Sequence, residues 1–164
     1  MKFNSVKEYF FRLNNAGYQL AMVPLIVFIF HYSTLHTFSL KLELSELSMY
    51  YLFMSSSMLL LIVLTVVHFY VQAAARKLVK VIGLGLKLER LGRVLLRRLV
   101  VLALVVLLMP VGLVFTHHTG FAIGFVVALL WYLVNWPTPA QVSNLLQLKG
   151  DEKEMVLSKG EAFK

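Results

Sequence analysis

The sequence contains no cysteine, and this absence excludes disulfide bonds and thiolate metal sites. Charged residues are also scarce, because they make up only 15% of the 164 residues; a soluble domain has roughly 25%. Hydrophobic residues make up 59% of the chain. A water-soluble protein of this size cannot bury so many apolar side chains, and the excess must face lipid. The composition therefore predicts an integral membrane protein.

Long stretches of the chain lack aspartate, glutamate, lysine and arginine altogether. A helix needs about 20 apolar residues to cross a hydrocarbon layer about 30 Å thick. Four stretches reach this length or come close to it: residues 17–38, 47–75, 99–115 and 118–136. We therefore expect an all-α fold, in which residues 1–136 form a four-helix transmembrane bundle.

The remaining residues, 137–164, are expected to form a short cytoplasmic tail with one helix. Thr138 is a good N-cap residue, and Pro139 suits the first position of a helix. Gly150 has the properties of a helix stop. The charged residues beyond Gly150 are expected to be loosely ordered.

Basic residues gather between the second and third predicted spans, in a stretch that we call the basic segment (residues 76–98). It accounts for most of the formal net charge of +8. Its cations are Arg76, Lys77, Lys80, Lys87, Arg90, Arg93, Arg97 and Arg98. Because short loops rich in lysine and arginine stay cytoplasmic, the charge pattern predicts that the basic segment and both termini face the cytoplasm.

The basic segment also has an apolar side. A helical wheel gives a stripe without cations, formed by Leu78, Val81, Gly85, Leu88, Gly92, Leu96 and Leu99. This pattern is typical of an amphipathic helix at the membrane surface, or of a helical hairpin that extends the two flanking spans. The wheel places Leu91 on the basic side, and the glycines predict a bend near residues 83–85. Anionic lipid headgroups are the expected partner, whereas nucleic acid is not expected because the positive-inside rule already accounts for the charge.

Four histidines map to the predicted outer end of the bundle, and we call them the outer histidines. They are His31, His36, His117 and His118. Imidazoles at one level could ligate a metal or hold a haem between helices. The spacing does not place either pair on one helix face, so we expect ordinary polar residues at a wet helix end, and no cofactor.

Small and polar residues mark two of the predicted spans. The serine run, Ser55 to Ser57 with Ser56 between them, could line a lumen or allow close helix contact. The small-residue row, formed by Gly120, Gly124 and Ala128, repeats every four residues and predicts helix packing. The sequence leaves open whether this packing is within the bundle or between subunits.

The sequence shows no nucleophile–base pair, no zinc-protease motif, no phosphate-binding loop and no paired carboxylates at a helix end. The predicted spans also lack the midplane charge that is typical of a pump. We therefore expect a small non-catalytic membrane subunit, in a bacterial inner membrane, that packs against other subunits of a larger complex. The first alternative is a homo-oligomeric channel or small-solute carrier, and the second is a haem- or metal-binding redox subunit that uses the outer histidines.

Overall fold

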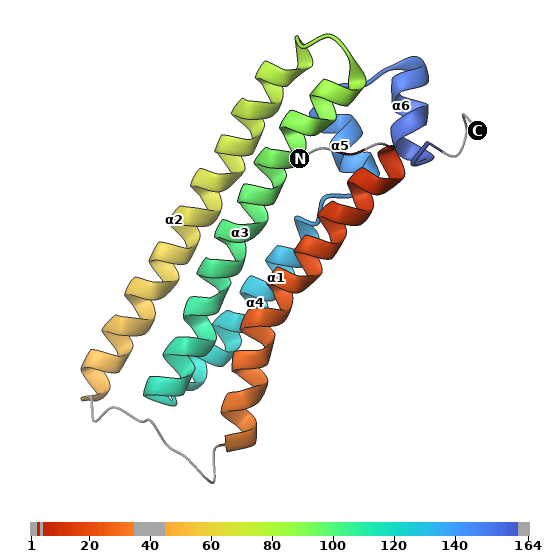
Figure 1. Cartoon of the computed structure of the whole chain (residues 1–164). Helices are drawn as coiled ribbons and strands as arrows, with labels where there is room; N and C mark the ends of the chain where they lie inside the picture. Colours follow the sequence, from red (N-terminus) through yellow and green to blue (C-terminus); the bar gives the residue numbers. More distant parts are fainter. Residues whose placement is uncertain (1–2, 4, 35–44, 161–164) are drawn as a thin grey trace. The chain divides into compact units, whose positions relative to one another are not determined.

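The computed structural model describes residues 3, 5–34 and 45–160, and within these residues the chain is helical without any strand. This confirms the all-α prediction for the described part of the chain. Figure 1 shows the helices in chain order. They are α1 (Val6–Thr34), α2 (Glu46–Val79), α3 (Leu84–Thr116), α4 (Thr119–Val134), α5 (Pro139–Leu145) and α6 (Gly150–Leu157).

Three of the helices are long and apolar enough to cross a membrane. These are α1 as far as His31, α2 and α3, judged by length and composition. The number rises to four if α4 and α5, which meet at a bend of 70°, count as one span. α4 alone has 16 residues, or about 24 Å at 1.5 Å per residue. The expected fourth span is therefore shorter than a typical hydrocarbon layer.

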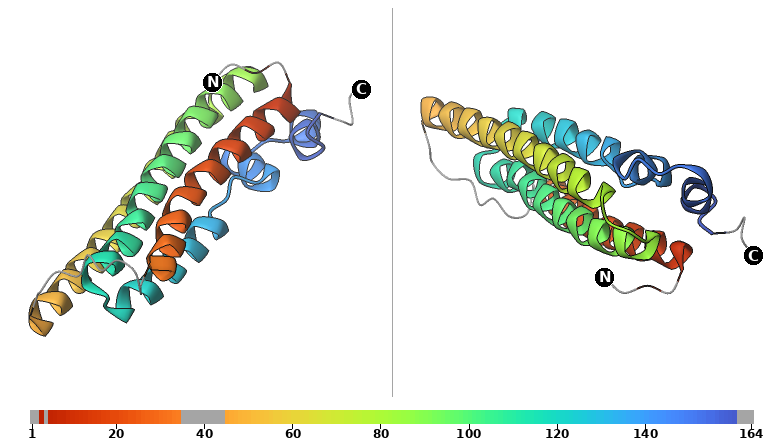
Figure 2. Two further views of the ribbon diagram at one scale, coloured as in Figure 1. Left: turned by 60° about the horizontal axis from the view of Figure 1, so that its bottom comes forward. Right: turned by 90° about the horizontal axis from the view of Figure 1, so that it is seen from above.

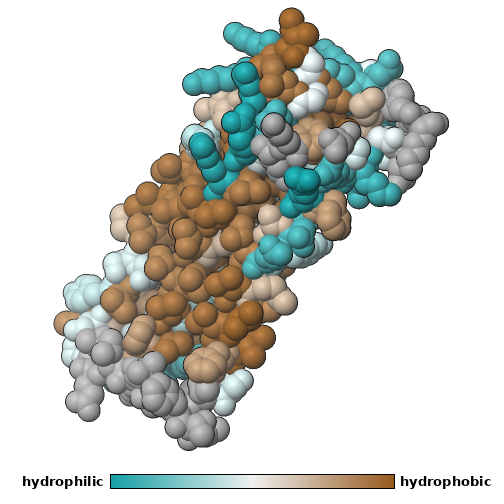
Figure 3. Space-filling view, viewed as in Figure 1, coloured by the Kyte–Doolittle hydropathy of each residue, from teal (hydrophilic) through white to brown (hydrophobic). Residues whose placement is uncertain are grey.

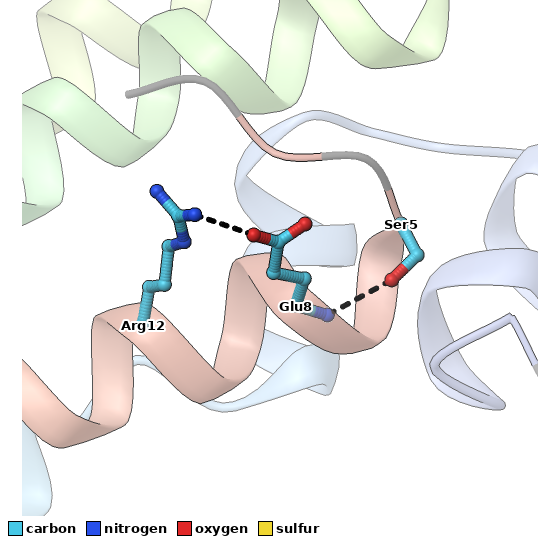
Figure 4. A network of polar contacts seen from close by, with 3 residues as sticks. All are labelled: Ser5, Glu8 and Arg12. Carbon is cyan, nitrogen blue, oxygen red and sulfur yellow. Dashed lines mark hydrogen bonds and ion pairs between the residues drawn. The ribbon is translucent and has the colours of Figure 1, made fainter.

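α1 begins earlier than the sequence predicted, because its first turn is capped. The Ser5 Oγ accepts a hydrogen bond from the Glu8 backbone N–H at 3.1 Å. Glu8 in turn forms an ion pair with Arg12 one turn later, at 2.6 Å (Figure 4). A serine cap followed by glutamate three residues later is typical of a helix start, so the helix extends well before the predicted span from residue 17.

The chain divides by its internal contacts into two compact units. Unit 1 contains Met1–Tyr18, Val67–Leu99 and Trp136–Lys164, and unit 2 contains Gln19–Val66 and Val100–Asn135. In Figure 3 the most hydrophilic side chains gather over unit 1, whereas much of the visible face of unit 2 is hydrophobic. The charged residues of the chain are thus concentrated in one unit.

Unit 1 has a core made by parts of five helices. Figure 2 shows α5 and α6 beside the beginning of α1. Tyr9 and Phe10 of α1 are buried there, and their rings meet edge to face with centroids 5.0 Å apart. The other core side chains include Val71, Ala75, Leu88, Leu91, Leu95, Val142, Leu146 and Val156.

Unit 2 is organised around two phenylalanines of α4. Phe125 stacks on Phe28 of α1 with ring centroids 4.5 Å apart. Phe121 meets Phe53 of α2 edge to face at 5.3 Å, and it lies so close to Gly112 of α3 that a Cβ atom there would be 2.4 Å from the ring. Aromatic contacts therefore join α4 to each of the other three helices of this unit.

Candidate functional site

The basic segment forms a helical hairpin, which is one of the two forms that the sequence left open. Residues 76–79 complete α2, Lys80–Gly83 form a turn, and the remainder belongs to α3. Gly83 has a φ of +94°, a value that glycine adopts without steric cost. The turn therefore ends α2 close to the predicted bend.

The structure separates the eight cations of the basic segment into three groups. Arg98 is only 6% exposed, so the expectation that all eight lie at the surface is wrong for this residue. Lys87 is paired with a carboxylate of the tail, as described below. The six cations that are exposed are Arg76, Lys77, Lys80, Arg90, Arg93 and Arg97.

The apolar stripe of the basic segment was only partly predicted. Leu78, Leu88 and Leu99 are buried as expected, but Leu91, which the wheel placed on the basic side, is also fully buried. Leu88, Leu91, Leu95 and Leu99 recur every three or four residues along α3, and all four are buried. Leu91 therefore belongs to the buried face of this helix and not to its basic side.

The tail is more ordered than predicted, because it contains two helices instead of one. The Thr138 Oγ1 accepts a hydrogen bond from the Gln141 N–H at 3.2 Å, and Pro139 follows it, so the predicted start is confirmed. The predicted stop is wrong, because α5 ends at Leu145 and Gly150 begins α6. Gln147, with a φ of +51°, adopts the left-handed conformation just after the end of α5 and before Gly150.

α6 is attached to the basic segment by an ion pair. The Lys87 Nζ lies 2.8 Å from the Glu152 Oε2, and the two side chains are 13% and 38% exposed. Val156 on the same helix is fully buried. Burying a valine is worth about 1.5–3 kcal/mol, whereas an ion pair this exposed contributes about 1 kcal/mol or less. The contacts described for α6 therefore hold it weakly. Glu152 was not singled out in the sequence, because no local pattern links it to a lysine 65 residues away.

Trp136 fixes the beginning of the tail against α1. Its Nε1–H donates a hydrogen bond to the Asn14 Oδ1 at 2.9 Å. Its indole ring covers Gly17, where a Cβ atom would lie 2.8 Å from Cη2, and its centroid is 4.7 Å from that of Tyr18. Asn14 and Gly17 of α1 thus form the binding surface for the Trp136 indole.

Two of the outer histidines come together. The rings of His31 and His117 meet edge to face with centroids 5.0 Å apart. His118 has a different role, since its Nδ1 accepts a hydrogen bond from the Gly120 N–H at 3.2 Å and caps α4. His36 lies outside the described residues. Among the described residues, no group of three or more histidine, aspartate or glutamate side chains could hold a metal ion.

The small-residue row lies against other helices of unit 2. A Cβ atom added at Gly124 would be 3.0 Å from the Met109 sulfur and 3.7 Å from the Phe53 ring. At Gly120 it would be 3.3 Å from the same ring, and Ala128 is buried. The row therefore contacts α2 and α3 of its own chain.

The serine run borders an open hollow on α2. The hollow has a volume of about 840 Å³, and the described residues that line it belong to this helix, among them Ser48, Tyr51, Ser55 and Met58. Ser55 donates its hydroxyl hydrogen to the Leu52 carbonyl oxygen at 3.0 Å. Of the 18-residue apolar window of α2, only 17% is buried. Much of the apolar window of this helix is thus not covered by the other described residues.

Comparison of this chain with protein-family models, with curated proteins and with solved structures finds no match.

Proposed function

We propose that the chain is a non-catalytic integral membrane subunit that binds a partner transmembrane helix through the outer face of α2. We define this face by the residues Ser48, Tyr51, Ser55, Met58, Ile62 and Thr65. All six are exposed, and they recur at alternating spacings of three and four residues. A repeat of 3.5 residues is the spacing at which two helices wind around each other. This exposed repeat is the observation that carries the proposal.

The chemistry of the outer face favours a helix over lipid as its neighbour. Ser48, Ser55 and Thr65 place three hydroxyl groups on it. Small polar residues are enriched where membrane helices meet, because they allow close approach and add hydrogen bonds. The small-residue row, which the sequence also offered as an interface, already contacts Phe53 and Met109 of its own chain. The outer face of α2 is the better candidate.

We infer four spans with both termini and the basic segment in the cytoplasm of a bacterial cell. The charge distribution supports this orientation, since lysine and arginine are disfavoured in translocated loops. α4 with the bent α5 supplies the fourth span. A helix shorter than the hydrocarbon layer is accommodated by local thinning of the bilayer and by flanking side chains that reach the interface.

The six exposed cations of the basic segment are proposed to bind anionic lipid headgroups. Each contributes about 1 kcal/mol when it lies near an anionic membrane surface. Of these six cations, two lie at the end of α2, Lys80 lies in the turn, and three lie on α3. This places several cations within reach of one patch of headgroups.

Crosslinking from single cysteines tests the proposed partner face. The sequence contains no cysteine, so Ser55→Cys and Ser56→Cys each introduce one thiol. The two positions are about 100° apart around the helix, which makes Ser56→Cys a matched control. We expect a benzophenone attached at position 55, and not at position 56, to form a discrete adduct in native membranes.

The identity of the adduct distinguishes the candidate functions. An adduct with a different membrane protein, identified by mass spectrometry, supports a subunit of a larger complex. An adduct with a second copy of the chain favours the homo-oligomeric channel, for which exposed Ser55 is the supporting observation. Equal or absent adducts at the two positions would show that the outer face of α2 is not an interface. The redox alternative has its own test, because a bound haem gives a visible absorption band in the purified chain.

A further inference from the structure

Lys87 of the basic segment contacts the tail. Its ammonium group is 2.8 Å from the Glu152 carboxylate, and its side chain is only 13% exposed. The cations on either side of it along α3 and the turn, Arg90 and Lys80, are exposed. One position in a basic surface is therefore occupied by an anion from the protein itself.

The helix that supplies this anion is acidic and has little buried surface. α6 carries Asp151, Glu152 and Glu154 against one cation, Lys153, and Val156 is its buried residue. α5, which precedes it, buries Val142 and Ser143. α6 thus contacts α5, and the ion pair between Glu152 and Lys87 connects it to the basic segment.

We propose that α6 is an acidic cover on the basic segment, and that phosphate groups compete with Glu152 for Lys87. This inference rests on the proposed binding of anionic lipids. A carboxylate and a phosphate both accept hydrogen bonds from an ammonium group, and the two cannot occupy the same position on Lys87. By linkage, binding of phosphate weakens the docking of α6 to the same extent that docked α6 weakens the binding of phosphate.

Hydrogen exchange of the α6 amides in the full chain tests the competition. The chain is placed in nanodiscs of phosphatidylcholine, or of phosphatidylcholine with phosphatidylglycerol, at low salt. We expect protection of the amides from Lys153 to Leu157 to fall about two- to fivefold in the anionic nanodiscs, as for loss of an exposed ion pair. Added salt should reduce the difference, because it screens both attractions.

Matched variants separate the ion pair from net charge. Glu152→Gln should lower the protection of α6 in phosphatidylcholine nanodiscs, whereas Glu154→Gln, with the same change in charge on the same helix, should not. Lys87→Gln should remove the difference between the two lipids, whereas Arg90→Gln should retain it. If Glu152→Gln and Glu154→Gln changed the protection of the α6 amides equally, the proposal would be contradicted.

Two further measurements identify the source of the phosphate and isolate a failure. Native mass spectrometry reports whether phosphatidylglycerol is retained over phosphatidylcholine. If phosphatidylglycerol is retained but the protection of the α6 amides does not change, the role of α6 as a cover is overturned and the proposed lipid binding stands. If both lipids are retained equally, the proposed lipid binding is overturned. Loss of protection on adding inorganic phosphate to phosphatidylcholine nanodiscs, without an effect of phosphatidylglycerol, supports the competition and excludes lipid as its source.

Discussion

The ring of Tyr9 occupies the space that a side chain on Gly92 would need. A Cβ atom at Gly92 would lie 2.7 Å from the Tyr9 Cε2. The ring cannot easily move away, because it meets Phe3 and Phe10 edge to face with centroids 5.1 and 5.0 Å distant. The packing of Tyr9 of α1 against α3 therefore depends on the absence of a side chain at Gly92.

Gly92→Ala is expected to destabilise the fold. Overpacking a buried site costs about 1–3 kcal/mol, and this exceeds the gain of about 1 kcal/mol for replacing glycine in a helix. Gly85→Ala is the control, since the same helix has open space at that position. Thermal unfolding in detergent should show a lower midpoint for Gly92→Ala and an unchanged or higher one for Gly85→Ala. Similar midpoints would mean that the Tyr9 ring moves aside at little cost.

Tyr9→Phe is expected to leave the free energy of unfolding unchanged or to raise it by up to about 1 kcal/mol. The Tyr9 hydroxyl is buried, and among the described residues it has no hydrogen-bond partner. A buried polar group without a partner costs about 1–3 kcal/mol, so its removal relieves this cost. Chemical denaturation measures the change, with Tyr18→Phe at an exposed position as the control. A clear loss of stability would reveal a partner for the hydroxyl.

Gly17→Ala is expected to displace the indole of Trp136 and to break its hydrogen bond to Asn14. The chain has two tryptophans, so a Trp131→Phe background leaves Trp136 as the only tryptophan, which can be excited selectively over the tyrosines. In that background Asn14→Ala removes the hydrogen bond without crowding the ring. Both changes should shift the emission maximum. An unaltered emission spectrum of the Gly17→Ala variant would show that a methyl group at position 17 fits against the Trp136 indole.

Arg93→Gln is expected to weaken the retention of phosphatidylglycerol, whereas Arg98→Gln is not. Arg93 is exposed, and Arg98 is 6% exposed. Loss of one cation near an anionic surface is worth about 1 kcal/mol, or roughly a fivefold change in affinity. Native mass spectrometry of the lipid-bound chain measures this change. A larger effect at Arg98 would mean that this side chain reaches the headgroups after all.

The helical class and the apolar stretches were predictable because they depend on local composition. Residues without charge over about 20 positions specify a helix that avoids water. The start of α5 was predictable for a similar reason, since Thr138 and Pro139 act within one turn. These features need no knowledge of what the rest of the chain does.

The details of the basic segment depended on contacts between distant residues. Leu91 and Arg98 are seven residues apart on α3, so they lie on one face of this helix, and both are buried by residues distant in the sequence. The second tail helix was missed because its charged sequence looks unstructured by composition, although Val156 is fully buried. The direction in which the small-residue row faces likewise depends on Phe53 and Met109, which periodicity cannot identify.

α2 is much longer than the hydrocarbon layer of a bilayer is thick. Its 34 residues extend about 51 Å, whereas the hydrocarbon layer needs about 30 Å. In the proposed orientation, a membrane that becomes thinner or thicker changes the tilt of this rod. A change in tilt is then expected to move the end of α2 at Val79 sideways, together with the Lys80–Gly83 turn that follows it. In this orientation, a change in bilayer thickness is thus expected to displace the turn on the proposed cytoplasmic side.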